Sequence, residues 1–532
     1  MLSEEIGDLI QRAVKDLQAK EVLPPFDMSQ IEIDYPTDRK NGDYSSNIVL
    51  KISKLVKINP LEVSKTLADK ILAYPEAKDL FSKVTGMAPG FVNFFIKPEY
   101  LHERVKEIIK EKEGFGKLDI GNQEKVNVEF ISANPTGPLT LGNGRGGFCG
   151  DVLASVLESC GYDVTREYYV NDRGEQIVKL GHSVLKDADA VYKGEYIDKL
   201  NKRIGKGELP EEVGDEAAGI ILKEMIKPAV KRMGINFDVW FSEKTLYDKG
   251  GVDGVIRVLE EKGHTYKSEG ATWFKSQELE DDKDRVLVRE NGIRTYFASD
   301  IAYLENKFQR GFKKLILFVG ADHYGYIARL KAGCQAMGFD KEAIDVILEQ
   351  LVRLFKDGQE VRMSKRTGTY VTLDELLDEV GLDVARFFFL QRSANTHLNF
   401  DLNLAKEQSQ KNPVFYIQYA HARICSILRK KKPGLFSSTN SKLLVEEAEL
   451  DLIKDLIKFP EVILKTAKDY QVQRLAQYSI DIADAFHRFY EKCQVIGEKP
   501  RLTQARLSLT LATKIVLKNT LNLMGISAPE KM

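Results

Sequence analysis

The feature that most constrains the fold is a strand, a glycine-containing loop and a helix that follow one another along the chain. Val126 to Ile131 is predicted as a buried strand, SANPTGPLTLGNG follows as the loop, and a helix continues to about Cys160. Apolar residues of that helix share one face, and Gly161 supplies a left-handed stop. This order of elements opens the α/β sheets that bind nucleotides.

The loop itself contains Gly142, Gly144 and Gly147, which satisfy the pattern G-x-G-x-x-G. Glycines there let backbone N–H groups approach a phosphate, while the helix that follows points its positive end at the same anion. A tight strand-to-helix turn without a ligand would show the same pattern. Ten residues separate Ile131 from Gly142, whereas dehydrogenases place the glycines directly after the strand, so the spacing favours a different phosphate loop.

The segment RMSKRTG, from Arg362 to Gly368, is the second candidate loop. It follows LVRLFKDGQEV, in which Asp357 and Gly358 predict a hairpin turn. Three basic side chains on such a loop can contact a polyphosphate, and Lys365 can stabilise the charge that builds on a leaving pyrophosphate. A surface loop with several Lys and Arg residues is the alternative interpretation of this segment.

The N-terminal part, residues 1–115, is predicted as a small α+β domain. An amphipathic helix over residues 3–18 and another from about Asn47 to Lys57 are combined with short strands at Ile31–Tyr35 and Phe91–Ile96. A polar segment that contains several glycines then leads into the next domain.

Two further domains are predicted after it. Residues 116–395 hold the nucleotide-binding sheet, with a second buried strand at Leu315–Val319 and a charge-rich insertion at about 185–290. Long helical patterns predict an all-α domain over residues 396–532, with a break at Pro433-Gly434 and a kink at Pro460.

The charges of the 532 residues nearly cancel, with 78 basic and 79 acidic side chains and a net charge of -1. On that total a nucleic-acid partner is disfavoured, because phosphate binding usually rests on a basic surface. Residues 396–532, however, hold 21 basic and 14 acidic residues, a net charge of +7, and the remainder carries -8. The near-neutral total therefore hides a basic C-terminal domain.

Membrane, secreted and metal-dependent classes lack support in the sequence. No run of about 18 apolar residues predicts a membrane span, and the N-terminus has no signal-peptide pattern. The five cysteines form no Cys-x-x-Cys pair, which fits the reducing cytoplasm. No metal spacing involves His182, His264, His397 or His487, and no H-E-x-x-H, G-x-S-x-G or Walker A segment occurs. We therefore expect a cytoplasmic protein without a dedicated metal site.

Together the two loops resemble the HIGH and KMSKS signatures of class I aminoacyl-tRNA synthetases, and nearly the whole chain is similar to the arginyl-tRNA synthetase family. The matching segments are VEFISANPTGPLTLGNGRGG, YYVNDRGEQI, TYFASDIAYL, GADHYGYIARLKA, RMSKRTGTYVTLDELLDEVG, NPVFYIQYAHARI and LMGISAPEKM. GDYSSNIVLKISK and PGFVNFF resemble that family's additional N-terminal domain, which contacts tRNA. The resemblance implies a multidomain α/β fold, with a Rossmann-like catalytic domain, an insertion and an all-α anticodon-binding domain.

The same resemblance implies ATP-dependent ligation of L-arginine to tRNA(Arg) through an arginyl-adenylate, with release of pyrophosphate and AMP. ATP would enter with Mg2+ as a substrate complex, and no tightly bound cofactor is expected. The family pattern also implies attack by the 2'-hydroxyl of tRNA, bound tRNA before the adenylate forms, and a monomer.

Where the family's first signature has two histidines, this sequence has Thr140 and Asn143. The family's histidines hydrogen-bond the ATP phosphates in the transition state; a Thr hydroxyl and an Asn amide can still donate, although neither carries a proton charge. The resemblance assigns Thr140, Asn143 and Lys365 to catalysis. It assigns ATP binding to Gly142, Gly144, Asp322, His323, Met363, Ser364 and Lys365. For His323, a core histidine bonded to backbone is an equal alternative.

Arginine as the substrate accounts for acidic residues near these loops, because a guanidinium needs carboxylates placed for forked hydrogen bonds. The family pattern implies that Glu129 and Asp300 supply them, that Tyr296 shapes the pocket and that Asn134 holds the head group. Tyr296 and Asp300 share a helical face if FASDIAYL is helical. Alternatively, Asp300 caps that helix and Glu129 pairs with a neighbour.

In the basic C-terminal domain, Tyr416, Tyr419 and Arg423 recur at i, i+3 and i+7. One helical face thus presents two rings and a cation, which suits the stacking of unpaired bases. Half-buried packing would give the same stripe. The match to NPVFYIQYAHARI favours tRNA binding.

Two other functions remain open at this point. A dehydrogenase would use G-x-G-x-x-G and an acid such as Asp163 on a cofactor ribose, and would leave RMSKRTG without a role. A non-catalytic tRNA-binding paralogue is the second, because both signature histidines are absent.

Overall fold

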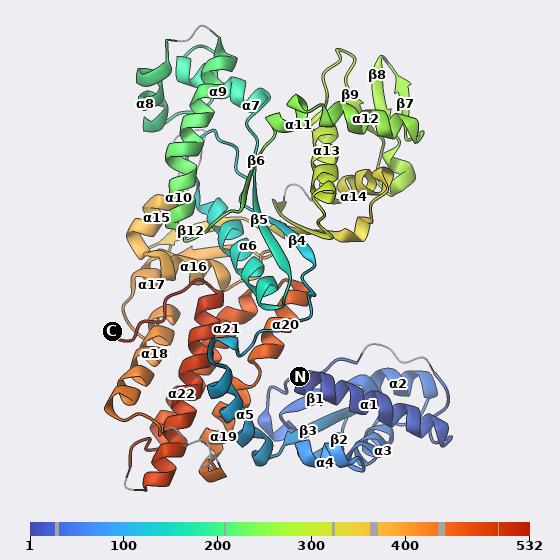
Figure 1. Cartoon of the computed structure of the whole chain (residues 1–532), viewed down its shortest axis with the longest axis vertical. Helices are drawn as coiled ribbons and strands as arrows, with labels where there is room; N and C mark the ends of the chain where they lie inside the picture. Colours follow the sequence, from blue (N-terminus) through green and yellow to red (C-terminus); the bar gives the residue numbers. More distant parts are fainter. Residues whose placement is uncertain (27–30, 207–208, 322–324, 362–370, 435–441, 498) are drawn as a thin grey trace.

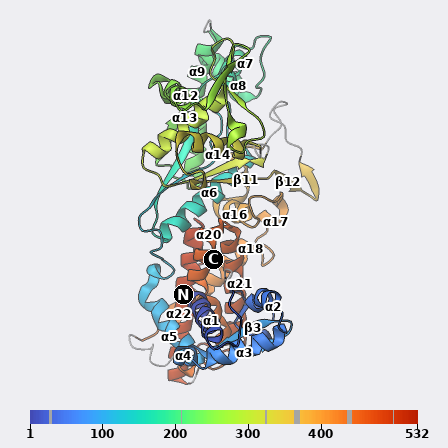
Figure 2. The ribbon, with the colours of Figure 1, turned by 90° about the vertical axis from the view of Figure 1, so that its right-hand side faces the viewer.

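The computed structural model describes residues 1–26, 31–206, 209–321, 325–361, 371–434, 442–497 and 499–532. In Figure 1 the molecule is elongated, with the central sheet in its upper half, long helices below it and a small α+β body beside those helices. Figure 2 shows the same vertical order after a turn of 90°. The predicted multidomain α/β class with a helical C-terminal part is confirmed.

The N-terminal body is built on a small antiparallel sheet with the strand order β1-β3-β2. Its elements are α1 Leu2–Ala19, β1 Tyr44–Ser46, α2 Ile48–Val56, α3 Pro60–Leu72, α4 Pro75–Leu80, β2 Phe81–Met87, β3 Phe91–Ile96 and α5 Pro98–Glu111. The helices predicted over 3–18 and from Asn47 to Lys57 are confirmed. The strand predicted at Ile31–Tyr35 is wrong: only Asp34 pairs there, with Ser45, and Pro36 has no N–H to extend the pairing.

The central sheet has five parallel strands in the order β11-β10-β4-β5-β6. Its strands are β4 Lys125–Glu129, β5 Asp163–Val170, β6 Val239–Ser242, β10 Lys314–Gly320 and β11 Ile344–Glu349. The chain leaves β4 through helix α6 (Leu141–Ser159) toward β5, and returns later to β10 on the other side of β4. The crevice beyond the carboxyl ends of β4 and β10 is where such sheets bind ligands.

The range predicted as an insertion, about 185–290, differs from the structure in one respect, because its strand β6 belongs to the central sheet. The helices before β6 are α7 Glu175–Leu185, α8 Glu195–Ile204, α9 Pro210–Ile221 and α10 Lys227–Arg232, with a π-helical segment Leu222–Ile226. After β6 come α11 Lys244–Asp248, α12 Gly251–Glu261, β7 Thr265–Ser268, β8 Ala271–Phe274 and β9 Arg285–Val288. All four residues of β6 are only half-buried, so no buried apolar run marks it in the sequence.

Helix α13, Tyr296–Gln309, confirms that FASDIAYL is helical, and α14, Tyr326–Met337, connects β10 to β11. A second sheet follows with the order β13-β12-β14. The elements of this region are β12 Val352–Lys356, β13 Gln359–Val361, α15 Leu373–Val380, α16 Leu382–Leu390, β14 Leu398–Asp401 and α17 Leu402–Lys406. The predicted hairpin turn is confirmed, since Asp357 and Gly358 adopt φ angles of 53° and 74° between β12 and β13.

From Pro413 onward the described residues of the C-terminal part form helices and loops and no strand. The helices are α18 Pro413–Lys430, α19 Glu447–Leu456, α20 Phe459–Asp469, α21 Gln473–Lys492 and α22 Pro500–Leu523. The predicted all-α domain is wrong at its start, at residue 396, because β14 (Leu398–Asp401) pairs with β12 in the second sheet. The predicted kink at Pro460 is wrong, because Pro460 stands in the first turn of a separate helix, α20, where its missing N–H is not needed. Among the described residues, no helix is both long and apolar enough to cross a lipid bilayer.

A polar seam attaches the N-terminal body to helices α19 and α20. Glu461 of α20, only 2% exposed, accepts hydrogen bonds from the hydroxyls of Tyr35 and Tyr44. Arg39 pairs with Asp455 at 2.7 Å. The seam places the small body against the helices rather than against the central sheet (Figure 1).

Arg386 of α16 fastens the end of the chain to the sheet region. Its side chain is 1% exposed and donates to the carbonyl oxygens of Met233 (3.1 Å) and Met524 (2.8 Å). It also pairs with Asp151 of α6 at 2.5 Å. One buried cation thus joins α6, the residue after α10 and the end of α22.

Helix α6 is buried along most of its length, and its glycines make this close packing possible. A Cβ atom at Gly150 would overlap the ring of Phe130, and one at Gly147 would overlap Met233. The helix therefore packs with its backbone close to its neighbours.

We expect Gly150→Ala to lower the free energy of unfolding by about 1–3 kcal/mol, because the new methyl group overpacks the core. Gly254→Ala in α12 is the matched control, since a Cβ there meets nothing within 4 Å. The control should leave stability unchanged or raise it by about 0.5–1 kcal/mol through helix propensity. Urea unfolding measures both; equal midpoints for the two variants would contradict the packing argument.

Candidate active site

The carboxyl edge of the central sheet gathers the acidic side chains of this region. Glu129 ends β4, Glu243 follows directly after β6, and Asp300 lies one turn into α13. The N-cap of α13 is Thr295, so the alternative that Asp300 caps this helix is wrong.

Glu129 is paired, as the alternative interpretation of the sequence predicted. Lys307 of α13 places Nζ 2.5 Å from Glu129 Oε2, and the Ser132 hydroxyl donates to Oε1 at 3.2 Å. The Lys307 side chain is fully buried. The charge of Glu129 is therefore balanced within the protein, and it can serve a ligand only together with Lys307.

Neither Asp300 nor Glu243 forms an ion pair with another described residue. Arg329 lies near enough to Asp300, and Arg173 near enough to Glu243, to lower the pKa of each carboxyl group, but burial has the larger effect. Burial, followed by the nearby charges of Glu243 and Glu129, raises the pKa of Asp300 to about 7, although a hydrogen bond with Tyr326 acts in the opposite direction. Burial and the charge of Asp172 likewise raise the pKa of Glu243 to about 7. Two carboxyl groups that repel each other in a protein-lined site form a receptor for a cation.

Aromatic rings and hydroxyls line the same site. Hydrogen bonds from Ser299 and Tyr169 stabilise the charged form of Glu243. The hydroxyl oxygens of Tyr247 and Ser299 lie 2.5 Å apart, and the guanidinium of Arg173 lies 3.6 Å from the centre of the Tyr247 ring. Tyr169 of β5 and Ser299 of α13 thus orient Glu243 from two different elements.

Glu243 was not identified from the sequence, because the short strand before it was predicted as part of an insertion. The sequence indicates Glu243 only weakly, as a carboxylate that directly follows the four residues VWFS. Only the pairing of β6 with β5 brings it to the carboxyl edge of the sheet.

Thr140 and Asn143 cap helix α6. The backbone N–H and the hydroxyl of Thr140 both donate to Asn143 Oδ1, at 2.9 and 3.0 Å. With its oxygen engaged in this way, the Asn143 side chain can offer only its amide N–H groups to a ligand. The pair therefore orders the helix N-terminus, where an anion is favoured.

Of the glycines predicted to bind a nucleotide, Gly142 is exposed in the first turn of α6, whereas Gly144 is buried. A Cβ at Gly144 would stand 2.9 Å from Leu373 Cδ1 and 3.1 Å from the Phe389 ring. Packing against α15 and α16 thus explains a glycine at position 144 without a ligand.

Asn134 and Tyr296 lie at the rim of the site. Asn134 is exposed in the loop after β4, and its carbonyl accepts from the Thr136 N–H at 2.7 Å. Tyr296 is 49% exposed at the start of α13. Its hydroxyl lies close to Gly174, since a Cβ atom added at that glycine would stand 2.9 Å from it. Tyr296 shares a face of α13 with Asp300, as predicted.

Five predicted nucleotide-binding residues lie outside the described part of the chain: Asp322, His323, Met363, Ser364 and Lys365. The ends of the strands that lead to them, Gly320 of β10 and Val361 of β13, are described.

The stripe of Tyr416, Tyr419 and Arg423 lies on α18 and packs against α21. The Tyr419 ring stacks 6.3 Å from the His487 ring, and the Tyr416 hydroxyl donates to Asp484 at 2.6 Å. The guanidinium of Arg423 lies 5.0 Å from the Tyr419 ring centre. These side chains are half-buried, so each keeps part of its surface for a partner.

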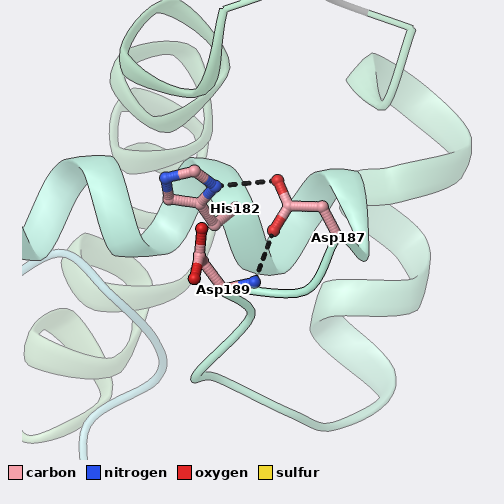
Figure 3. Close-up of side chains that lie close together, drawn as sticks. All are labelled: His182, Asp187 and Asp189. Carbon is pink, nitrogen blue, oxygen red and sulfur yellow. Dashed lines mark hydrogen bonds and ion pairs between the residues drawn. The ribbon is translucent and has the colours of Figure 1, made fainter.

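One group of side chains in the described residues has a geometry that could hold a cation: His182, Asp187 and Asp189 (Figure 3). The His182 ring bonds Asp187 at 2.7 Å, and Asp187 accepts from the Asp189 N–H at 3.0 Å. These contacts organise the turn after α7, and both carboxylates are exposed.

Asp163, the acid considered for a dehydrogenase, lies at the wrong edge of the sheet. It is the first residue of β5, beside Lys125 at the start of β4. The ligand-binding edge is at the other end of these parallel strands.

Known families match the chain in three consecutive regions. The family described as "Arginyl tRNA synthetase N terminal domain" matches residues 4–96. The "tRNA synthetases class I (R), catalytic domain" matches 104–202 and 211–426, and the "DALR anticodon binding domain" matches 417–532.

Curated relatives are similar over the full length. The chain is 42% identical over 566 residues to the arginine–tRNA ligase of Acetivibrio thermocellus, covering 100% of this chain and 99% of that protein. It is 41% identical over 558 residues to the arginine–tRNA ligase of Bacillus subtilis, covering 100% of both. The solved arginyl-tRNA synthetase of Thermus thermophilus shares the fold, with a TM-score of 0.79, 21% identity and full coverage of both chains.

We expect Asp300→Asn to raise the stability of the unliganded protein in a pH-dependent way. A carboxyl group whose pKa is raised in the folded state holds its proton more tightly there, so it costs stability as the pH rises from about 4 to 7. The gain from the neutral amide should grow across that window to at most about 4 kcal/mol and stay constant above it. Urea unfolding at several pH values measures it.

Glu167→Gln is the control, and it should change the free energy of unfolding in the opposite direction. Burial of Glu167 is outweighed by Lys307 and by hydrogen bonds from Arg310 and Tyr303, so its pKa is lowered. This variant should lose stability above about pH 4. An effect of Asp300→Asn that does not depend on pH would contradict the raised pKa of Asp300.

Proposed function

The chain belongs to the arginyl-tRNA synthetase family, and from that membership we propose how its residues divide the work of the reaction. The enzyme ligates L-arginine to tRNA(Arg) with ATP. The arginine carboxylate attacks the α-phosphate of ATP and expels pyrophosphate, and a terminal ribose hydroxyl of tRNA then attacks the adenylate and releases AMP. Neither step requires a covalent bond to the enzyme, so catalysis rests on positioning and on stabilisation of charge.

The observation that carries our assignment of the arginine site is a pair of carboxyl groups, Asp300 and Glu243, whose pKa values are raised to about 7 and which have no ion-pair partner among the described residues. A guanidinium is planar, permanently charged and rich in donors, so it fits between two acceptors. We assign Asp300 and Glu243 to the guanidinium. Glu129 with Lys307 forms the floor of the pocket, Tyr296 closes its rim, and Asn134 holds the amino-acid head group.

We propose that two parts of the protein contact the ATP phosphates from opposite sides. The N-terminus of α6 contacts one side through the backbone N–H of Gly142, the side-chain amide of Asn143 and the helix dipole. Thr140, whose N–H and hydroxyl donate to Asn143, orients that amide. Lys365 acts on the other side, where charge develops on the leaving pyrophosphate. Mg2+ enters with ATP as part of the substrate, and Asp322 and His323 belong to the nucleotide side of the site.

We propose that domain 396–532, with Tyr416, Tyr419 and Arg423, binds the anticodon region and that domain 1–115 makes a further tRNA contact. The net charge of +7 on the C-terminal domain supports this role. Domain 116–395 carries the chemistry.

We also propose that the enzyme works in the cytoplasm as a monomer. All five cysteines are buried and unpaired, as expected in a reducing compartment. A measurement of the molecular mass in solution tests the proposal that the enzyme is a monomer.

Arginine-dependent exchange between ATP and pyrophosphate, with and without tRNA, tests the activation step. Exchange that depends on arginine supports catalysis, whereas tRNA binding without exchange would reveal a non-catalytic paralogue. The difference between the two arms shows whether bound tRNA is needed.

We expect Asp300→Asn and Glu243→Gln each to raise the KM for arginine about 10- to 100-fold, because each removes a charged hydrogen-bond acceptor. The KM for ATP should change little. Since the free carboxyl groups have pKa values of about 7, arginine should bind more tightly at pH 8 than at pH 6 and release protons, which calorimetry in buffers of different ionisation enthalpy detects. Equal effects on arginine and ATP would assign both residues to structure alone.

We expect Tyr419→Ala to raise the KM for tRNA about 10-fold or more, because a stacked base is lost, with the KM for arginine unchanged. Tyr419→Phe is the matched control and should retain the binding. Charging assays at limiting tRNA, together with unfolding midpoints, separate base stacking from packing on α21. Normal charging by the Ala variant would refute the assignment.

A further inference from the structure

We propose that Arg145 is a positioning residue that holds the root of the β12–β13 hairpin against helix α6. RMSKRTG directly follows β13 in the sequence. Arg145 would therefore set where the two phosphate-binding parts of the site stand relative to each other. This inference rests on the role proposed above for Lys365.

Arg145 lies in the first turns of α6, two residues after Asn143, and its side chain is fully buried. It makes no ion pair with a described residue. Instead, it donates to two backbone carbonyls, that of Gln350 at 3.1 Å and that of Ser393 at 2.6 Å. A buried cation that binds only carbonyls is unusual, because most buried guanidinium groups have a carboxylate partner.

The two carbonyls belong to the segments that lead into β12, the first strand of the hairpin, and into β14, the strand beside it. Gln350 stands between β11 and β12, and its own N–H donates to the Ala394 carbonyl at 2.9 Å. Ser393 precedes β14, which pairs in parallel with β12. Arg145 thus holds the starts of two adjacent strands, β12 and β14, against the start of α6.

A second anchor lies where the chain leaves RMSKRTG. The Leu373 N–H donates to the Leu139 carbonyl at 2.9 Å, and Thr372 forms a β-bridge with Thr140. The described residues that follow RMSKRTG in the sequence therefore contact the residues that cap α6. Arg145 holds the start of β12, before the segment, against the same helix.

The packing around Arg145 leaves little room for another arrangement. A Cβ at Gly146 would stand 2.5 Å from Glu349 Oε1, so α6 touches the end of β11 with its backbone. Burial raises the pKa of Glu349 to about 8, against the charge of Arg145. Near neutral pH this carboxyl group is largely protonated, and it does not draw the guanidinium away from the two carbonyls.

The test is a double-mutant cycle of Arg145→Met and Lys365→Ala, measured by arginine-dependent ATP–pyrophosphate exchange with saturating tRNA. Arg145→Met alone should lower kcat about 100-fold, as expected for a small displacement of a catalytic group, and leave the KM for arginine unchanged. If Arg145 acts through the segment of Lys365, the double variant should be little slower than Lys365→Ala alone. Arg145→Lys, which can still reach a carbonyl, should restore part of kcat.

Arg386→Met is the matched control, because Arg386 is also buried and also donates to two backbone carbonyls. Its effect on kcat should multiply with that of Lys365→Ala, as for independent sites. Arg145→Met effects that multiply in the same way, or an unchanged kcat, would overturn the inference. If Arg145→Met does not fold, Arg145→Lys carries the same cycle.

The cycle also separates this inference from the function on which it rests. Unchanged exchange by Lys365→Ala would refute the leaving-group role and leave Arg145 nothing to position. An impaired Lys365→Ala with an unchanged Arg145→Met would refute the inference about Arg145 alone.

Discussion

The close packing of helix α6 is the constraint on which the rest of the structure depends. The helix contacts the central sheet, the β12 region and helices of the C-terminal part. Its glycines allow this, since Gly147 and Gly150 stand where any side chain would overlap Met233 or Phe130. A pattern that in the sequence suggests a phosphate loop thus serves mainly to bring backbones together. The helix N-terminus can face a phosphate because the remainder of α6 is held on all sides.

The elements with strong local signals could be predicted from the sequence. The strand before α6, the Asp357-Gly358 turn and the helical C-terminal part have clear periodicity or turn chemistry. Strand β6 could not be predicted, because four half-buried residues carry no pattern of their own and only pairing with β5 creates the strand. Glu243 was missed for the same reason. The pairing of Glu129 with Lys307 likewise joins residues 178 positions apart, which no local pattern encodes.

Charge is divided between the parts of the molecule in a way that the total hides. Two carboxyl groups at the sheet edge have no ion-pair partner in the part of the chain that the structure describes, and residues 396–532 carry a net charge of +7. The same chain therefore offers an acidic pocket to a small cation and a basic surface to a polyanion. The C-terminal helices lie below the central sheet in the elongated molecule (Figure 1), and screening by salt limits the distance over which each field acts.

The contact between Arg386 and Met524 has a consequence for the synthesis of the protein. The guanidinium lies between α16, α6 and the end of α22, and one of its acceptors is the carbonyl of residue 524. While the ribosome is still translating the helices after α16, that donor has no protein partner, and a buried unsatisfied donor is unfavourable. The sheet region can collapse earlier, but its junction with α16 reaches its final form only after residue 524 has been added. The contact between the sheet region and the C-terminal helices is therefore complete only once α22 has been synthesised.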